Sequence, residues 1–329
     1  MLAGRAEGVA LRSATRALTR RSRRSGADVR LVLVYHGVRA TSDLPGMFPP
    51  KIERSTFVDH LDHLHANYDV VPLRTLIDAP VERRSGRRTR IALTFDDDLC
   101  GLVTEAAPLL RERGLPATFF LTGSSLDGEF NEWWNDVEAI ATRGGDAWTR
   151  ALAELTPTWP WLAGASPAAL AATITGLAPA DRARLAAALR KLSAGQGADP
   201  GISAAQVGGL VEDGFEIGFH TLRHHPLDTL GDAELELAVG EGLDDLSRAA
   251  GGRPDSIAYP HGRADLRVAH AAAEAGFKRG FVMGADRAFR RDDHPLLLPR
   301  VDPYSGSLTV EAFGFRLARL GFAAARRGS

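Results

Sequence analysis

The chain has 329 residues, a hydrophobic content of 44% and a formal net charge of −1. This length and apolar content allow one large α/β core or two ordinary domains, and the balanced charge argues against a general polyanion binder. No run of about 18 uncharged apolar residues is present and Cys100 is the only cysteine, so we expect neither a membrane-spanning helix nor an internal disulfide.

The first 27 residues are strongly basic. Their single acid is Glu7, and their arginines are Arg5, Arg12, Arg16, Arg20, Arg21, Arg23 and Arg24. We expect a basic N-terminal arm over residues 1–27, either solvated and partly disordered or folded as an exposed helix, followed by one domain over residues 28–329. Arginine interrupts every apolar run that could serve as a secretory signal, so we expect a cytoplasmic protein.

From residue 28 onward, strand-like and helix-like segments alternate. Residues 30–35 form a continuous apolar run that is typical of a buried strand, and residues 57–64 repeat apolar side chains at helical spacing. The same patterns predict strands over residues 69–72, 91–95, 117–122, 215–219 and 256–259, and helices over residues 104–113, 204–212, 232–250 and 266–275. Repeated strand-then-helix units predict a parallel sheet, open or closed into a barrel.

Residues from about 128 to 200 interrupt this alternation. They are rich in alanine and leucine with helical periodicity, which predicts a helical insertion, and they hold all five tryptophans. Indole rings stack well on sugar rings, so Trp133 and Trp134, which follow an expected strand and its loop, are candidates for substrate contact. Packing of the insertion is the alternative for this pair, and it is the first interpretation for Trp148, Trp159 and Trp161.

Reactive side chains fall where expected strands end. They are His36, the aspartates at 96–98, the histidines at 220 and 224, and His261. Ligands of parallel α/β folds bind at the carboxyl ends of strands, so we expect these side chains to converge. Consecutive acids at the end of a buried strand need a cation or a shared proton. One carboxylate with two imidazoles is a zinc-type ligand set, and three protein ligands leave the open position of a catalytic site.

Three motifs carry a resemblance to a known family. In chain order they are Thr94-Phe95-Asp96-Asp97, His220-Thr221-Leu222-Arg223-His224 and Tyr259-Pro260-His261-Gly262. Over residues 30–300 outside the insertion, the chain resembles the polysaccharide deacetylase family, that is, the NodB homology domain of carbohydrate esterase family 4. The resemblance implies a deformed (β/α) barrel that uses a divalent metal to hydrolyse the N-acetyl amide of amino sugars.

Site roles follow from the resemblance position by position. It implies that Asp96 is the general base toward metal-bound water, and that Asp97, His220 and His224 bind the metal. That metal is expected to be Zn²⁺, with Co²⁺ or Ni²⁺ as alternatives because they accept the same ligands. The third motif implies an oxyanion contact from the main chain of His261, next to Tyr259.

The amide leaving group also requires a general acid, for which histidine is suited. The family's late Leu-x-His motif is absent from the C-terminal region. Some relatives resemble a circular permutation with an N-terminal Tyr-His strand, so His36 is the first candidate for the acid, with His261 and His294 as alternatives. Histidines on expected helices without paired acids are expected at the surface: His60, His63, His65 and His270.

Two departures from the family pattern concern the acid run. Asp98 stands where the family has glycine, and it either tolerates a left-handed backbone or reaches the metal. The family's third motif opens with an arginine that pairs with the base, whereas this chain has Ala258 or Tyr259 there. Arg300 is the candidate replacement.

We therefore expect a metal-dependent carbohydrate N-deacetylase that binds an N-acetylated saccharide and no nucleic acid. Hydrolysis of another non-peptide C–N bond, in a cyclic imide or ureide, and a non-catalytic glycan-binding scaffold are the alternatives. The C-terminal segment interleaves aromatic residues with arginines, so peripheral contact of the basic termini with an acidic membrane is a further hypothesis, beside capping of the barrel. The oligomeric state is not predicted.

Overall fold

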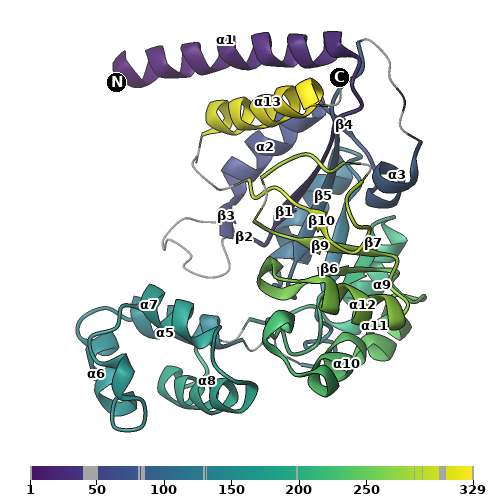
Figure 1. Cartoon of the computed structure of the whole chain (residues 1–329). Helices are drawn as coiled ribbons and strands as arrows, with labels where there is room; N and C mark the ends of the chain where they lie inside the picture. Colours follow the sequence, from purple (N-terminus) through teal and green to yellow (C-terminus); the bar gives the residue numbers. More distant parts are fainter. Residues whose placement is uncertain are drawn as a thin grey trace.

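The computed structural model describes residues 2–39, 51–80, 82, 86–128, 130, 132–197, 199–284, 286–290, 292–303 and 309–327, with side chains from residue 7 onward. Its centre is an eight-stranded sheet surrounded by helices (Figure 1). None of the described helices combines the length and the apolar character that a membrane crossing requires.

The central sheet is parallel. Its order is β1 (Arg30–Tyr35), β5 (Arg90–Asp96), β6 (Thr118–Leu121), β7 (Glu216–Phe219), β8 (Ser256–Ala258), β9 (Arg279–Val282) and β10 (Leu298–Pro299), with β4 (Asp69–Val70) also pairing with β5. Val301, just after β10, pairs with Leu33 of β1. This contact brings the two edges together, so the sheet is nearly closed and the expected deformed (β/α) barrel is confirmed.

Alternation along the strands separates two apolar layers. Inside the barrel, Val32, Ala92, Phe120, Phe281 and Leu298 from five strands form one cluster with Ala258, Leu73 and Leu76. The alternate residues face the helices and belong to the larger core. A Cβ at Gly218 would lie 2.3 Å from the ring of Phe120, so glycine at this position leaves room for that ring inside the barrel.

Helices surround the barrel. They are α2 (Arg54–Asn67), α3 (Leu73–Asp78), the π-helical turn Leu102–Ala106 leading into α4 (Ala107–Glu112), α9 (Ala204–Glu212), α10 (Asp232–Gly240), α11 (Leu243–Ala249) and α12 (Leu266–Glu274). A small sheet of β2 (Gly37–Arg39) and β3 (Lys51–Glu53) follows β1. The single helix expected over residues 232–250 is wrong, because Gly242 adopts φ 77° and separates α10 from α11.

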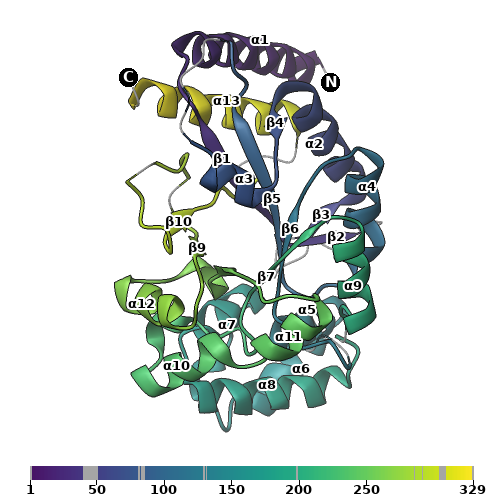
Figure 2. The same ribbon diagram turned by 90° about the vertical axis from the view of Figure 1, so that its right-hand side faces the viewer.

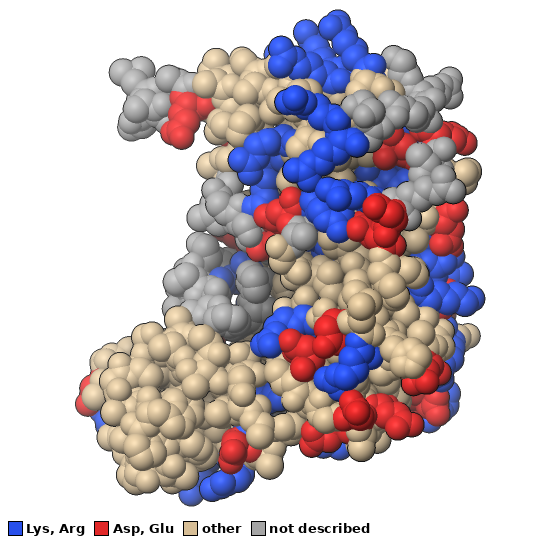
Figure 3. Space-filling view, viewed as in Figure 1, with Lys and Arg blue, Asp and Glu red and all other residues tan. Residues whose placement is uncertain are grey.

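Both termini lie at one end of the molecule. Helix α1 (Leu2–Ser25) runs beside α13 (Val310–Arg327) in the same direction, since Arg12 contacts Glu311 and the hydroxyl of Ser22 donates to the carbonyl of Gly321 (Figure 1). Of the basic arm, residues 2–25 are helical. In Figure 3, Lys and Arg side chains gather over this end of the molecule.

The insertion lies at the opposite end from α1 and α13 (Figure 2). It consists of α5 (Trp133–Thr142), α6 (Ala147–Leu155), α7 (Pro167–Ile174) and α8 (Pro179–Ser193). Phe130 and Asp199 form an antiparallel bridge, so the chain leaves and re-enters the barrel at one place. The carboxylate of Asp199 also accepts a hydrogen bond of 2.8 Å from the amide of Cys100, which ties this place to the loop after β5.

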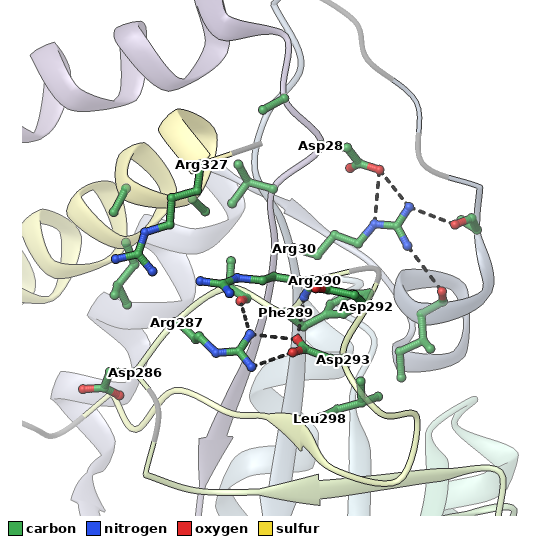
Figure 4. A pocket seen from close by; sticks show the side chains of 18 of the residues that line it. Asp28, Arg30, Asp286, Arg287, Phe289, Arg290, Asp292, Asp293, Leu298 and Arg327 are labelled. Atoms are coloured by element: carbon green, nitrogen blue, oxygen red, sulfur yellow. Dashed lines mark hydrogen bonds and ion pairs between the residues drawn. The ribbon is translucent and has the colours of Figure 1, made fainter. Parts of the chain in front are cut away.

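A cavity of about 1110 Å³ lies at the amino end of β1, bordered by α13 and by residues 286–290, 292, 293 and 295 (Figure 4). In it, Arg30 points toward Asp28 and Arg287 pairs with Asp293 at 2.6 Å. Because His36 follows the other end of β1, this cavity lies away from the residues predicted to carry the chemistry.

Asp28 links the first two central strands. Its carboxylate is 1% exposed and pairs with Arg30 at 2.7 Å and with Arg90. Burial alone would raise the pKa of Asp28, but hydrogen bonds from the two arginines lower it overall. The stabilisation is therefore complete above the ordinary carboxyl pKa and is lost as the pH falls through the lowered value.

Replacing Asp28 by alanine is expected to lower the free energy of unfolding by about 3–5 kcal/mol, because two buried guanidinium groups lose their counter-charge. Urea denaturation measures this change. Asp62 is the control, since it is 61% exposed and pairs with Arg113 at the surface. Asp62→Ala should cost less than about 1 kcal/mol, and equal losses in the two variants would contradict the buried-pair account.

Candidate metal centre and active site

The carboxyl ends of the barrel strands carry a set of polar side chains directed inward. Val32, Ala92 and Leu298 face the interior, and the period of two along a strand places His36, Asp96 and Arg300 on the same side. The register pairs Tyr35 with Phe95, so His36 lies level with Asp96. Convergence of these strand ends, as expected from the sequence, is observed.

Asp97, His220 and His224 form a compact ligand cluster. One ligand atom from each lies within 4.8 Å of the others, and all three residues are buried. Oδ1 of Asp97 is 3.6 Å from Nε2 of His220 and 3.5 Å from Nε2 of His224. Ligands at zinc bond lengths and a tetrahedral angle lie about 3.4 Å apart. The donor set therefore fits a zinc-type divalent cation.

Hydrogen bonding orients the side chain of His220. Its Nδ1 lies 2.8 Å from the carbonyl oxygen of Ala258, which can only accept, so Nδ1 carries the proton and Nε2 presents its lone pair toward Asp97. The ring of His224 is held by packing, because the ring of Trp134 meets it edge-on at 4.8 Å between centroids. Nδ1 of His224 is buried without a hydrogen-bond partner among the described residues.

The charge balance of the cluster also favours a cation. Burial, followed by the charges of Asp96 and Glu132, raises the pKa of Asp97 well above its ordinary value. Oδ1 of Asp97 is buried and accepts no hydrogen bond in the described part of the chain. Because buried carboxylates of like charge disfavour each other's ionised form, a divalent cation at Asp97 would relieve a cost that the charge of Arg300 offsets only in part.

Backbone strain gathers in the same place. Asp97 (φ 74°), Thr221 (φ 58°), His224 (φ 46°) and His261 (φ 58°) all adopt the left-handed conformation that non-glycine residues avoid. Each such residue costs about 1–3 kcal/mol and is typical of functional sites. The left-handed position is thus Asp97, so the first of the two alternatives given for Asp98, a left-handed backbone, is wrong.

Asp98 does not reach the cluster. Its carboxylate accepts hydrogen bonds from the amide and hydroxyl of Thr122, at 2.7 and 2.8 Å, and from the hydroxyl of Ser125 at 3.1 Å. These bonds fix the loop after β6 against the end of β5. Asp98 therefore supports the site from behind and is no ligand in this arrangement.

Asp96 is paired with Arg300. The guanidinium donates two hydrogen bonds of 2.6 Å to the carboxylate, and both side chains are almost fully buried. Burial raises the pKa of Asp96, but the charge of Arg300, with that of His220, lowers it overall, so Asp96 is ionised. The structure places Arg300, the candidate replacement for the family's arginine, on the carboxylate expected to be the base.

The candidate acids differ in position. His36 lies at the site with its Nδ1 unpartnered among the described residues, and burial lowers its pKa to about 4 although Asp96 acts in the opposite direction. His261 lies with its ring centroid 4.7 Å from that of His224. His294 is exposed and its Nδ1 accepts a hydrogen bond from the amide of Leu296, so it is not part of this group.

The other residues predicted to contact the substrate, Tyr259, Trp133 and Trp134, are packed inside the protein. The hydroxyl of Tyr259 donates to the carbonyl of Leu296 at 2.9 Å, so this side chain is not gathered with the ligands. Trp133 and Trp134 are 5% and 4% exposed and meet each other edge-on. The surface position expected for His60 is wrong, because its ring is buried and stacks on Phe313 of α13.

Two charged residues of the insertion were not singled out from the sequence. Glu132, just before Trp133, has its pKa raised to about 8 by burial, with Arg182 acting against this change. Arg182, in α8, is 5% exposed. Glu132 could have been identified from the sequence, because it stands next to the tryptophan pair. Arg182 could not, because a buried arginine in an alanine-rich helix has the same local sequence pattern as an exposed one.

A family model described as polysaccharide deacetylase matches residues 83–176 and 190–280, together more than half of the chain. No curated protein matches the chain. The match to the family model covers enough of the chain to assign it to a family.

Several solved structures are similar. IcaB from Ammonifex degensii superimposes with a TM-score of 0.57 at 19% identity, covering 88% of this chain and 97% of that chain. A de-N-acetylase from Aggregatibacter actinomycetemcomitans gives 0.56 at 18%, covering 87% and 100%. The deacetylase PplD from Streptococcus pyogenes, solved in complex with acetate, gives 0.52 at 16%, covering 84% and 92%. At these identities the likeness shows the shared fold, while the circular permutation stays a prediction.

One divalent cation per chain is expected after incubation with Zn²⁺ and removal of the excess, measured by elemental mass spectrometry. His224→Ala should lose this cation because only two ligands remain, whereas Asp96→Asn should keep it because Asp96 is paired with Arg300. A His224→Ala protein that retains a full equivalent would rule out the cluster as the binding site.

Proposed function

We propose, from the premise that this chain belongs to the polysaccharide deacetylase family, that it is a metal-dependent hydrolase removing the N-acetyl group from an amino sugar in a glycan or glycoside. One observation carries the proposal. An arginine-bound carboxylate, Asp96, lies next to a buried cluster of one carboxylate and two imidazoles at the carboxyl end of the barrel.

Asp97, His220 and His224 would hold the cation. A divalent cation supplies Lewis acidity toward the amide carbonyl and toward water. Zinc is the first candidate, since the oxygen and nitrogen donors and the spacing suit it, and cobalt or nickel are the alternatives.

Asp96 acts as the general base and accepts a proton from the attacking water. Its bidentate pairing with Arg300 keeps it ionised and fixes its orientation. His36, on the neighbouring strand, donates a proton to the departing nitrogen. Because burial lowers the pKa of His36 to about 4, it is neutral at rest, and it takes up this proton during turnover from the attacking water by way of Asp96. The main chain of His261 stabilises the oxyanion.

The alternative functions are less well supported. A scaffold that had lost turnover would be expected to lack the base or a ligand, and here Asp96 and the three ligands are all in place. Hydrolysis of a cyclic imide or ureide would use the same base and cation. Measuring acetate release distinguishes the two reactions, because only N-deacetylation produces acetate. Cytoplasmic location, and contact of the basic helices α1 and α13 with an acidic membrane, remain predictions.

Acetate release from N-acetylglucosamine-containing oligosaccharides is the direct test. Chelation should abolish it, and Asp96→Asn should lower kcat by about 10²–10⁴-fold with the cation retained, because general-base catalysis contributes on that scale. Asp98→Asn, a change in the adjacent acid that keeps much of its hydrogen bonding, is the control and should have a smaller effect on kcat. Wild-type protein that releases no acetate yet hydrolyses an imide would overturn the proposal.

Arg300→Lys tests the positioning of the base. Without bidentate pairing the pKa of Asp96 should rise, so the acidic limb of the pH–kcat profile should move to higher pH while cation content is unchanged. Arg279→Lys is the matched control, since Arg279 is also buried but pairs with Asp78 and Asp255 at the start of β9. An acidic limb that stays in place in Arg300→Lys would remove Arg300 from this role.

A further inference from the structure

The cavity at the amino end of β1 is lined by two kinds of side chain. Among the described residues that border it, every side chain is either apolar or charged, and none carries a neutral hydrogen-bonding group. The apolar part comes from the start of β1, the region of α3, the segment leading into β10, and α13, and it includes Val29, Ile77, Phe289, Leu298, Leu320 and Ala324. At about 1110 Å³, the cavity is large enough for a small-molecule ligand.

The buried charges of this lining are already satisfied. All three guanidinium nitrogens of Arg30 donate hydrogen bonds, to the carboxylate of Asp28 and to main-chain carbonyls that include that of Leu76 at 2.8 Å. Arg287 is bound to Asp293 at 2.6 Å. No buried polar side-chain atom of the described lining lacks a hydrogen-bond partner. The interior therefore offers a ligand apolar surface without free hydrogen-bonding side chains, which suits an alkyl chain better than a sugar or a nucleobase.

Two arginines of the lining are free to bind a ligand. Arg290, in the segment before β10, and Arg327, at the end of α13, are both exposed, and neither guanidinium forms an ion pair or a hydrogen bond in the described part of the chain (Figure 4). No aspartate or glutamate occurs at the undescribed positions that adjoin the lining in the sequence, which are 81, 83–85, 285, 291, 328 and 329.

The acids of the lining do not neutralise these two arginines. Asp28 and Asp293 are bound by the arginines named above, and Asp286 accepts a hydrogen bond from Arg316. Asp292 is the lining acid that has no arginine partner among the described residues. The unpaired charges of the described lining are therefore positive in sum, at the end of the molecule where Figure 3 shows basic side chains gathered, and such a cavity attracts an anion.

We propose that this cavity binds an amphipathic anion, with its alkyl chain against the apolar lining and its phosphate or carboxylate on Arg290 and Arg327. Burial of the chain supplies hydrophobic stabilisation, and a guanidinium binds either anionic group through two parallel hydrogen bonds. The site lies at the opposite end of β1 from His36, so it is separate from the metal cluster and does not depend on the proposed function.

Calorimetric titration of the wild-type protein tests this assignment. The probes are octyl phosphate, octanoate, octyltrimethylammonium and inorganic phosphate, and the first two distinguish a phosphate from a carboxylate ligand. We expect at least one octyl anion to bind about tenfold or more tightly than the octyl cation, which cannot bond to arginine. It should also bind more tightly than inorganic phosphate, because only the octyl compound buries a chain.

Two variants locate the site. Replacing Arg290 and Arg327 together by alanine should weaken binding of the preferred octyl anion about tenfold or more, because its charge-assisted hydrogen bonds are lost. Ala323 lines the cavity from α13 and is exposed, so Ala323→Trp should fill part of the space and weaken the same anion about tenfold or more without disturbing the core.

Arg319→Ala is the matched control, since Arg319 is an exposed arginine of α13 outside the described lining. It should bind the octyl anion as the wild-type protein does, and so should chelator-treated wild-type protein. Absent binding of both octyl anions, equal binding of the octyl cation, or an affinity that survives the arginine and tryptophan variants would overturn the assignment. An affinity that disappears on chelation would do so as well, because it would place the anion at the metal cluster.

Discussion

Three consecutive carboxylates at the end of β5 are the constraint on which the rest of the site depends. Asp96, Asp97 and Asp98 are all buried, and a buried run of like charges is unstable unless each member is compensated. The fold compensates them in three ways. Arg300 pairs with Asp96, hydroxyl and amide groups of Thr122 and Ser125 solvate Asp98, and Asp97 faces two imidazoles where a cation fits.

Closure of the barrel makes this division possible. Arg300 lies between β10 and Val301, the residue that joins the last strand to β1, and so it reaches a carboxylate that is more than 200 positions away in the sequence. Alternation along the strands directs His36 and Asp96 into the same space. The left-handed backbone at Asp97 then turns that carboxylate out of line with Asp96, toward His220 and His224. Adjacent acids thereby acquire different neighbours.

Much of this arrangement was predictable from local patterns. The first strand was predicted over residues 30–35 and is observed there, and the three residues predicted from strand-end motifs to bind the metal lie close together. Other features depend on contacts between distant segments. His60 was expected at the surface because its helix shows no paired acid, but α13, from the far end of the chain, covers it. The break between α10 and α11 depends on the left-handed backbone of Gly242, which the spacing of apolar residues does not predict.

The insertion shows the same limit more clearly. Its helical character is visible in the composition, yet burial of Arg182 depends on how α8 packs against α5, which no local signal reports. Arg300 could be proposed from the sequence only because Asp96, the expected base, lacked the arginine that pairs with it in the family and therefore required another positive charge. Residues that complete a local chemical requirement can thus be found from sequence, while a residue buried by the packing of two helices is found only in the structure.

Anomalous diffraction from crystals of the zinc-loaded protein tests the central claim most directly. The account predicts one peak at about 2.0–2.2 Å from an oxygen of Asp97 and from Nε2 of His220 and of His224, with Asp96 still bound to Arg300. A peak elsewhere, or Asp96 in the coordination sphere in place of Asp97, would contradict it.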